Sequence, residues 1–137
     1  MSIVLDASMT VVWALADEQM AAAQQVLRQV VAEGAIVPAI WGLEVANAMR
    51  SAVRRGRCDE AYVDRSLARF ARLPITVDPE TADRAWGRTR QLARDEGLTT
   101  YDAAYLELAL RTGAPVASCD RLLIEAARRR DLVVWTA

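Results

Sequence analysis

The segment Ile3-Val4-Leu5-Asp6 is a short apolar run that ends in an acidic residue. A second run of this kind, Pro115-Val116-Ala117-Ser118-Cys119, is followed directly by Asp120. Helical patterns separate the two runs, and strands that alternate with helices build a parallel sheet covered on both faces. Because parallel strands share a carboxyl edge, Asp6 and Asp120 meet there if their strands are neighbours.

Short β-type runs alternate with helical patterns along the whole chain. We expect strands at Ile3–Asp6, Ala35–Val37, Ile75–Val77, Pro115–Cys119 and Leu132–Trp135. We expect helices at Thr10–Ala16, Met20–Glu33, Ala39–Arg55, Asp59–Arg72, Pro79–Glu96, Thr100–Arg111 and Arg121–Arg130. The pattern predicts a single domain over residues 1–137, with the α/β fold class. Its architecture would be a three-layer α/β/α sandwich around a parallel, five-stranded sheet. With the strand order 3-2-1-4-5, the order reverses between the first and fourth strands, which end at Asp6 and Asp120.

Several predicted helices begin or end with residues that are typical of helix ends. Glycine follows four of the predicted helices or helix-like segments, at Gly34, Gly56, Gly97 and Gly113. Glycine is the residue that most readily adopts the left-handed conformation that ends helices. Asp78-Pro79 predicts a helix N-cap followed by proline at the first helical position.

Two further acidic residues fall in the first turns of predicted helices. Glu44 stands in the otherwise apolar stretch Ile40–Met49, where it shares a helix face with Asn47 and Ser51. Asp102 opens a helix that is apolar nearly all round, so its acidic tip should face a cleft lined by protein. Asp6, Asp102 and Asp120 each have a plainer explanation as a turn or cap residue, and Thr99 lies three residues before Asp102, close to a capping box. Glu44 is harder to dismiss, because buried acids are uncommon unless paired or metal-bound and only an arginine could pair with it.

The four acids together are harder to explain as caps. Converging carboxylates repel one another by roughly 4 kcal/mol per pair at about 4 Å and an effective dielectric near 20. A divalent cation would offset that repulsion, and ligands that are all oxygen favour Mg²⁺ or Mn²⁺ over zinc. The pattern therefore points to a metal-dependent nuclease.

The composition excludes several other chemistries. The chain has no histidine, and all 17 of its basic residues are arginine. This excludes Ser-His and Cys-His catalysis, imidazole metal ligands, a P-loop and a lysine Schiff base. Cys58 and Cys119 form no zinc or disulfide pattern. No segment resembles a signal peptide or a membrane span, so we expect a cytoplasmic protein without membrane contact.

Four segments together resemble the PIN-domain ribonucleases, in particular the toxins of VapBC-type toxin–antitoxin pairs. They are Val4–Ser8 with Trp13 and Asp17-Glu18 after it, Glu44 with Asn47, Thr100–Ala109, and Ala117–Arg121. The resemblance implies a fold of the same α/β/α kind and a metal-binding set of Asp6, Glu44, Asp102 and Asp120. It also implies that Ser8, Asn47 and Ser118 hydrogen-bond those ligands, and Thr100 either joins them or only caps its helix.

The activity implied by the resemblance is Mg²⁺- or Mn²⁺-dependent hydrolysis of RNA phosphodiester bonds by a toxin that a cognate antitoxin neutralises. The resemblance also implies a homodimer that joins a larger complex with the antitoxin. We expect RNA contacts at Arg54, Arg55 and Arg57, although arginines at a helix C-terminus also complement the helix dipole, which better explains Arg128–Arg130. Trp13, Trp41 and Met49 suit a partner surface or core packing equally well.

The main alternative is a catalytically silent PIN-like interaction module, against which the presence of all four acids argues. A DNA flap nuclease generally needs helical additions for which 137 residues leave no room. A dehalogenase-type phosphatase needs a second aspartate two residues after the first and a lysine, but position 8 is serine and the chain has no lysine.

Overall fold

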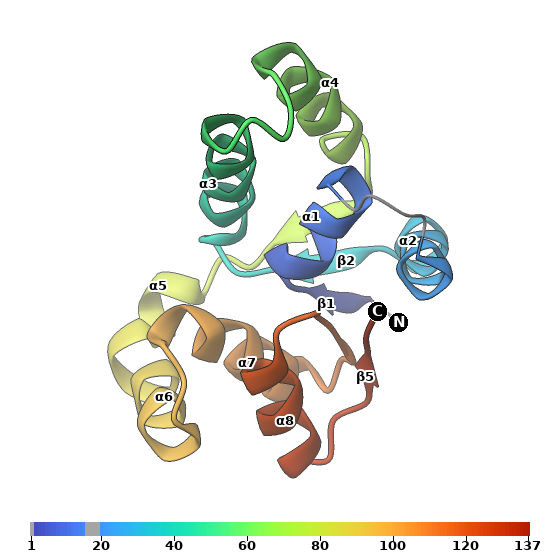
Figure 1. The fold of residues 1–137 in the computed structure, drawn as a ribbon. Coiled ribbons are helices and arrows are strands. Elements are labelled where there is room, and N and C mark those ends of the chain that lie inside the picture. The colour runs from blue at the N-terminus through green and yellow to red at the C-terminus, as the bar shows by residue number, and fades with distance from the viewer. Residues whose placement is uncertain (1, 16–19) are drawn as a thin grey trace.

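The computed structural model describes residues 2–15 and 20–137 and contains a five-stranded parallel sheet (Figure 1). The strands are β1 (Ile3–Leu5), β2 (Ala35–Val37), β3 (Ile75–Val77), β4 (Val116–Ala117) and β5 (Val134–Trp135). Their order across the sheet is β3-β2-β1-β4-β5, and all four neighbouring pairs are parallel. The predicted strand order is therefore confirmed, with β1 and β4 adjacent at the point where the order reverses.

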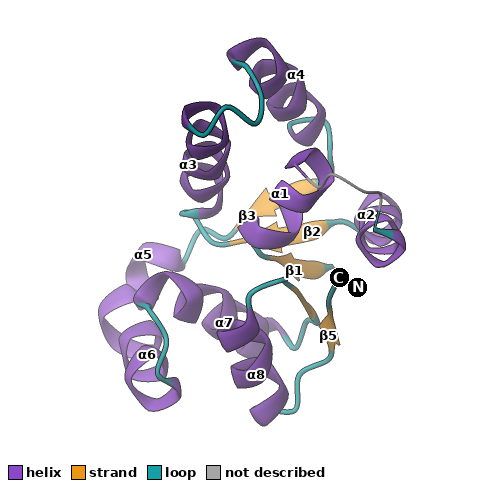
Figure 2. Ribbon diagram, in the orientation of Figure 1, coloured by secondary structure: helices purple, strands orange, loops and turns teal. Residues whose placement is uncertain are grey.

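Helices cover both faces of the sheet, as Figure 2 shows. In chain order they are α1 (Ala7–Leu15), α2 (Ala21–Glu33), α3 (Trp41–Arg54), α4 (Glu60–Phe70), α5 (Thr81–Arg84), the π-helical turn η1 (Ala85–Thr89), α6 (Arg90–Glu96), α7 (Thr100–Thr112) and α8 (Arg121–Arg129). Helices α1 to α4 lie on one side of the sheet, and α5 to α8 lie on the other. This is the predicted α/β/α sandwich.

Side chains alternate along β1, so each face of the sheet has its own core. Val4 packs with α6, α7 and α8, whereas Ile3 and Leu5 pack with α1 and α2. All three are buried because the sheet is covered on both faces, which is why β1 is a continuous apolar run. A third cluster, which includes Val45, Met49 and Phe70, joins α3 and α4 to α1.

Several predicted boundaries were wrong. The first helix begins at Ala7, directly after Asp6, and its predicted end at Ala16 lies outside the described residues, as do Asp17 and Glu18. The predicted helix Pro79–Glu96 is divided into α5, η1 and α6. A π turn keeps the chain helical while adding one residue to the turn. The strand predicted at Pro115–Cys119 is shorter, because it pairs only through Val116 and Ala117.

The four glycines predicted to end helices all have positive φ. The N-cap predicted at Asp78 is wrong, because α5 begins at Thr81 and its N-cap is Glu80. Asp78 instead accepts a hydrogen bond from the Glu80 backbone N–H at 3.2 Å, which makes a turn before the helix.

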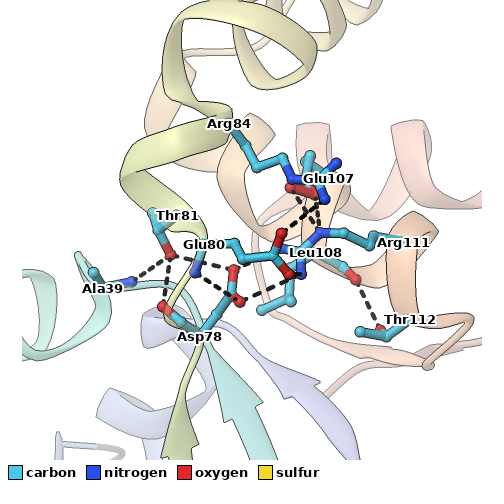
Figure 3. Close-up of polar contacts among 9 residues, drawn as sticks. All are labelled: Ala39, Asp78, Glu80, Thr81, Arg84, Glu107, Leu108, Arg111 and Thr112. Atoms are coloured by element: carbon cyan, nitrogen blue, oxygen red, sulfur yellow. Dashed lines mark hydrogen bonds and ion pairs between the residues drawn. The ribbon is translucent and has the colours of Figure 1, made fainter.

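Asp78 has a larger role as part of a partly buried ion cluster (Figure 3). Arg111, near the end of α7, contacts Asp78 at 2.5 Å, Glu80 at 3.1 Å and Glu107 at 3.0 Å. Burial raises the pKa of Asp78, but the hydrogen bonds and charge of Arg111 outweigh it, so the pKa lies below its ordinary value. The cluster ties α7 to the connection between β3 and α5.

Two tryptophans and one methionine that could have formed a partner surface belong to the core. Met49 is fully buried, and the partly buried Trp13 and Trp41 pack against core clusters. The indole N–H of Trp13 donates to the Ala23 carbonyl, and that of Trp41 donates to the Thr10 hydroxyl. No helix among the described residues is long and apolar enough to cross a membrane.

Candidate active site

The four predicted acids come from four different elements. Asp6 follows β1, Glu44 and Asp102 lie in the first turns of α3 and α7, and Asp120 precedes α8. Asp6 and Asp120 stand just beyond the carboxyl ends of the neighbouring strands β1 and β4. This is the edge of the sheet, at the reversal of strand order, where open α/β folds place their ligands.

Asp6 is buried and held by two serines. Oδ2 of Asp6 accepts hydrogen bonds from the Ser8 hydroxyl at 2.6 Å and the Ser118 hydroxyl at 2.7 Å. These hydroxyls accept from the backbone N–H groups of Cys119 and Asp120, both at 2.9 Å. The backbone just after β4 therefore orients both serine hydroxyls, and the hydroxyls in turn hold the Asp6 carboxylate in place at the end of β1.

Glu44 has a partner that the sequence did not suggest. The Tyr105 hydroxyl, from the middle of α7, donates to Oε1 of Glu44 at 2.6 Å. Among basic residues only arginine was available to pair with Glu44, but a tyrosine inside an apolar helix does so instead. The sequence signal was weak, since such a residue is usually core packing.

Asp102 and Asp120 are both near helix N-termini. The Thr99 hydroxyl, at the N-cap of α7, accepts from the Asp102 backbone N–H at 3.1 Å. Oδ1 of Asp120 accepts from the Leu123 backbone N–H at 3.0 Å and caps α8. The simple capping role considered for Asp120 is therefore real, and it leaves Oδ2 without a protein hydrogen bond among the described residues.

The pKa values show that the acids act on one another. Burial raises the pKa of Asp102 to about 6, and the charges of Asp120, Asp6 and Glu44 contribute to that rise. Burial also raises the pKa of Asp6 and of Glu44, with a further contribution from Asp120 to the first and from Asp6 to the second. The four carboxylates therefore form one electrostatic cluster.

The donor set suits a hard cation. Within residues 2–15 and 20–137, no arginine forms an ion pair with any of the four acids. Their mutual repulsion is thus not offset by the described residues, and oxygen-only donors fit Mg²⁺ or Mn²⁺. As the side chains stand, no three acidic or cysteine groups in this part of the chain are arranged to hold one ion.

The remaining predicted site residues make no hydrogen bond or ion pair to the four acids among the described residues. Asn47 is exposed one turn after Glu44, and no hydrogen bond joins it to the acids among the described residues. Thr100 is exposed and begins α7, whereas Thr99 is its N-cap. Arg54 and Arg55 are exposed at the end of α3, about 15 Å along the helix axis from Glu44. Arg57 donates to the Leu15 carbonyl at 2.5 Å.

Comparisons with known proteins agree with this fold. A crystal structure of PAE2754 from Pyrobaculum aerophilum superposes with a TM-score of 0.70 at 22% identity, covering 97% of this chain and 83% of that one. No curated protein matches the sequence. Residues 3–129 match the PIN domain, whose members are generally metal-dependent nucleases. The match spans most of the chain, which therefore belongs to the PIN domain family.

Proposed function

We propose that this protein is an Mg²⁺- or Mn²⁺-dependent endoribonuclease that acts as the toxin of a type II toxin–antitoxin pair. The observation that carries the proposal is the electrostatic cluster of Asp6, Glu44, Asp102 and Asp120, which has no described arginine to neutralise it. Membership of the PIN domain family supports a nuclease. The resemblance to VapBC-type toxins supports the more specific role.

Asp6, Glu44 and Asp102 would hold the metal ion, with Asp120 as a fourth acid. A bound divalent ion polarises a phosphoryl oxygen and stabilises the charge that develops on the leaving oxygen. Ser8 and Ser118 keep Asp6 oriented through their hydrogen bonds to Oδ2. Oδ2 of Asp120, free of protein hydrogen bonds among the described residues, is available to orient a water for in-line attack on phosphorus.

The proposal also names the partners of the protein, which are an RNA substrate, an antitoxin and a second copy of the chain. The exposed Arg54 and Arg55 offer forked donors to phosphate, and Arg57 has further N–H groups besides the one that contacts Leu15. With a net charge of −1, attraction to RNA must be local and sensitive to salt. A cognate antitoxin would restrain the activity, and a homodimer is the expected assembly.

The first test is cleavage of total cellular RNA by purified protein in Mg²⁺ or Mn²⁺, with EDTA as the control. We expect discrete fragments that disappear in EDTA, and their ends would identify the target. Absence of cleavage by folded protein shown to be free of antitoxin would contradict the proposal. That result would favour the silent interaction module.

Metal binding should also stabilise the fold without any substrate. A ligand at about 100 times its Kd adds roughly 2.7 kcal/mol to the free energy of unfolding. We therefore expect Mg²⁺ or Mn²⁺ to raise the melting temperature of the wild-type protein, as measured by circular dichroism. Asp102→Asn should show a smaller rise, and an equal rise in both proteins would place the ion elsewhere.

A further inference from the structure

Tyr105 joins two helices at the candidate active site through a single polar atom. Its ring lies in the core with Val4 and Leu106, and the residue is fully buried. Its hydroxyl reaches across 61 positions of sequence to Oε1 of Glu44, at 2.6 Å. A phenylalanine would fill the same apolar space, so the hydroxyl serves the hydrogen bond rather than the packing.

The contact engages one oxygen of Glu44 and leaves the other available. Among residues 2–15 and 20–137, no hydrogen bond or ion pair reaches Oε2. Because the tyrosine ring is surrounded by core residues, its hydroxyl has little freedom to move away from Oε1. Glu44 is therefore held so that one oxygen faces the phenol and the carboxylate cannot rotate freely.

We propose that Tyr105 is a positioning residue that restricts Glu44 to binding a metal ion through one oxygen, and that it thereby favours Mg²⁺ or Mn²⁺ over Ca²⁺. This inference rests on the proposed function, because it concerns the same metal site. Mg²⁺ demands near-octahedral ligands and keeps several waters, so single carboxylate oxygens suit it. Ca²⁺ accepts more ligands in a flexible arrangement and often takes both oxygens of one carboxylate.

The test compares Tyr105→Phe with the wild-type protein by titration calorimetry with Mn²⁺, Mg²⁺ and Ca²⁺, in the absence of RNA. We expect the affinity for Mn²⁺ and Mg²⁺ to fall about tenfold or more, the usual scale for losing a residue that orients a metal ligand. The affinity for Ca²⁺ should fall less, because a freed Glu44 offers both oxygens. The ratio of Mn²⁺ to Ca²⁺ affinity is a readout that a merely structural role would not move.

Tyr101→Phe is the matched control, because it makes the same chemical change one turn earlier on α7, at an exposed side chain. Its affinities should equal those of the wild-type protein. An unchanged Mn²⁺-to-Ca²⁺ ratio in Tyr105→Phe would overturn the positioning role while leaving the metal site intact. Failure of the wild-type protein to bind any of the three ions would overturn both this inference and the proposed function.

A second measurement does not depend on the variant. The chain has three tyrosines, so protein that carries 3-fluorotyrosine should give three ¹⁹F NMR resonances. We expect Mg²⁺ to shift the Tyr105 resonance and to leave that of Tyr62, which lies on α4, in place. Saturating Mg²⁺ that leaves all three resonances unmoved would contradict contact between Tyr105 and a metal-binding Glu44.

Discussion

Asp102→Asn is expected to abolish RNA cleavage without lowering the stability of the metal-free protein. Loss of one group that stabilises charge in an active site slows enzymes by roughly 10²–10³-fold. The ionised carboxylate also destabilises the metal-free fold, because burial and three neighbouring acids raise its pKa to about 6. A folded-state pKa above the unfolded value means that the ionised group destabilises the fold at neutral pH. Asparagine keeps the shape and removes that charge.

Cleavage of total RNA and thermal melting in EDTA, both at about pH 7.5, check the two parts of this prediction. Asp6→Asn should also lose cleavage. Asp64→Asn is the control, since it makes the same change at an exposed position on α4. If Asp102→Asn cleaved RNA at the wild-type rate, Asp102 would not belong to the metal-binding set.

Arg111→Met is expected to cause the largest loss of stability, although Arg111 lies outside the candidate active site. The change leaves Asp78 and Glu107, whose side chains are only 3% and 4% exposed, without their cation. Removing one partner of a buried ion pair costs about 3–5 kcal/mol. We expect a loss near the lower end, roughly 3 kcal/mol, because Glu80 on the same cluster is open to solvent. Denaturant unfolding of the metal-free protein measures it.

Arg129→Met provides the comparison, because the same change there breaks a more exposed ion pair with Glu96. That variant should stay within about 1 kcal/mol of the wild-type stability. Equal losses of stability in the two variants would mean that burial does not make the Arg111 ion pairs more stabilising than an exposed pair.

The Arg111 cluster also predicts how stability changes with pH. The pKa of Asp78 lies below its unfolded value of 3.8, so its contribution to stability is present above that pH and is lost as the pH falls through the folded-state pKa. In Arg111→Met, the hydrogen bonds and charge of Arg111 no longer oppose burial, so the pKa of Asp78 rises above its wild-type value, although the Glu80 N–H and the Thr81 hydroxyl still lower it. The difference in stability between the two proteins should therefore shrink as the pH falls from about 7 to about 4. If the difference in stability between the two proteins stayed constant across that range, Arg111 would not stabilise the fold through the charge of Asp78.

The parallel sheet and the position of the acids were predictable because the signals for them are local. β1 and β4 are short apolar runs buried on both faces, and the helices between the runs favour parallel strands. β1 lies within its predicted range, β4 is shorter than predicted, and Glu44 and Asp102 fell in the first turns of helices as expected. Periodicity and the residues at helix ends are sufficient for features of this kind.

Contacts between distant helices were not predictable in the same way. Asp78 resembled a helix cap by sequence, but its partner is Arg111, 33 positions later. Tyr105 resembled a core residue, but its hydroxyl contacts a helix that begins 64 positions earlier, at Trp41. The π turn at Ala85–Thr89 was missed because it continues the helix rather than ending it.

The sequence by itself determined the parallel α/β architecture and the positions of the acids at strand ends and in the first turns of helices, because hydrophobic period and the residues at helix ends can be read from short segments. The tertiary structure alone decided that the Tyr105 hydroxyl holds Glu44 and that Arg111 neutralises Asp78. Those two contacts depend on how α7 packs against α3 and against the β3–α5 connection. Packing of whole helices sets them, because their partners lie 61 and 33 positions apart in the sequence.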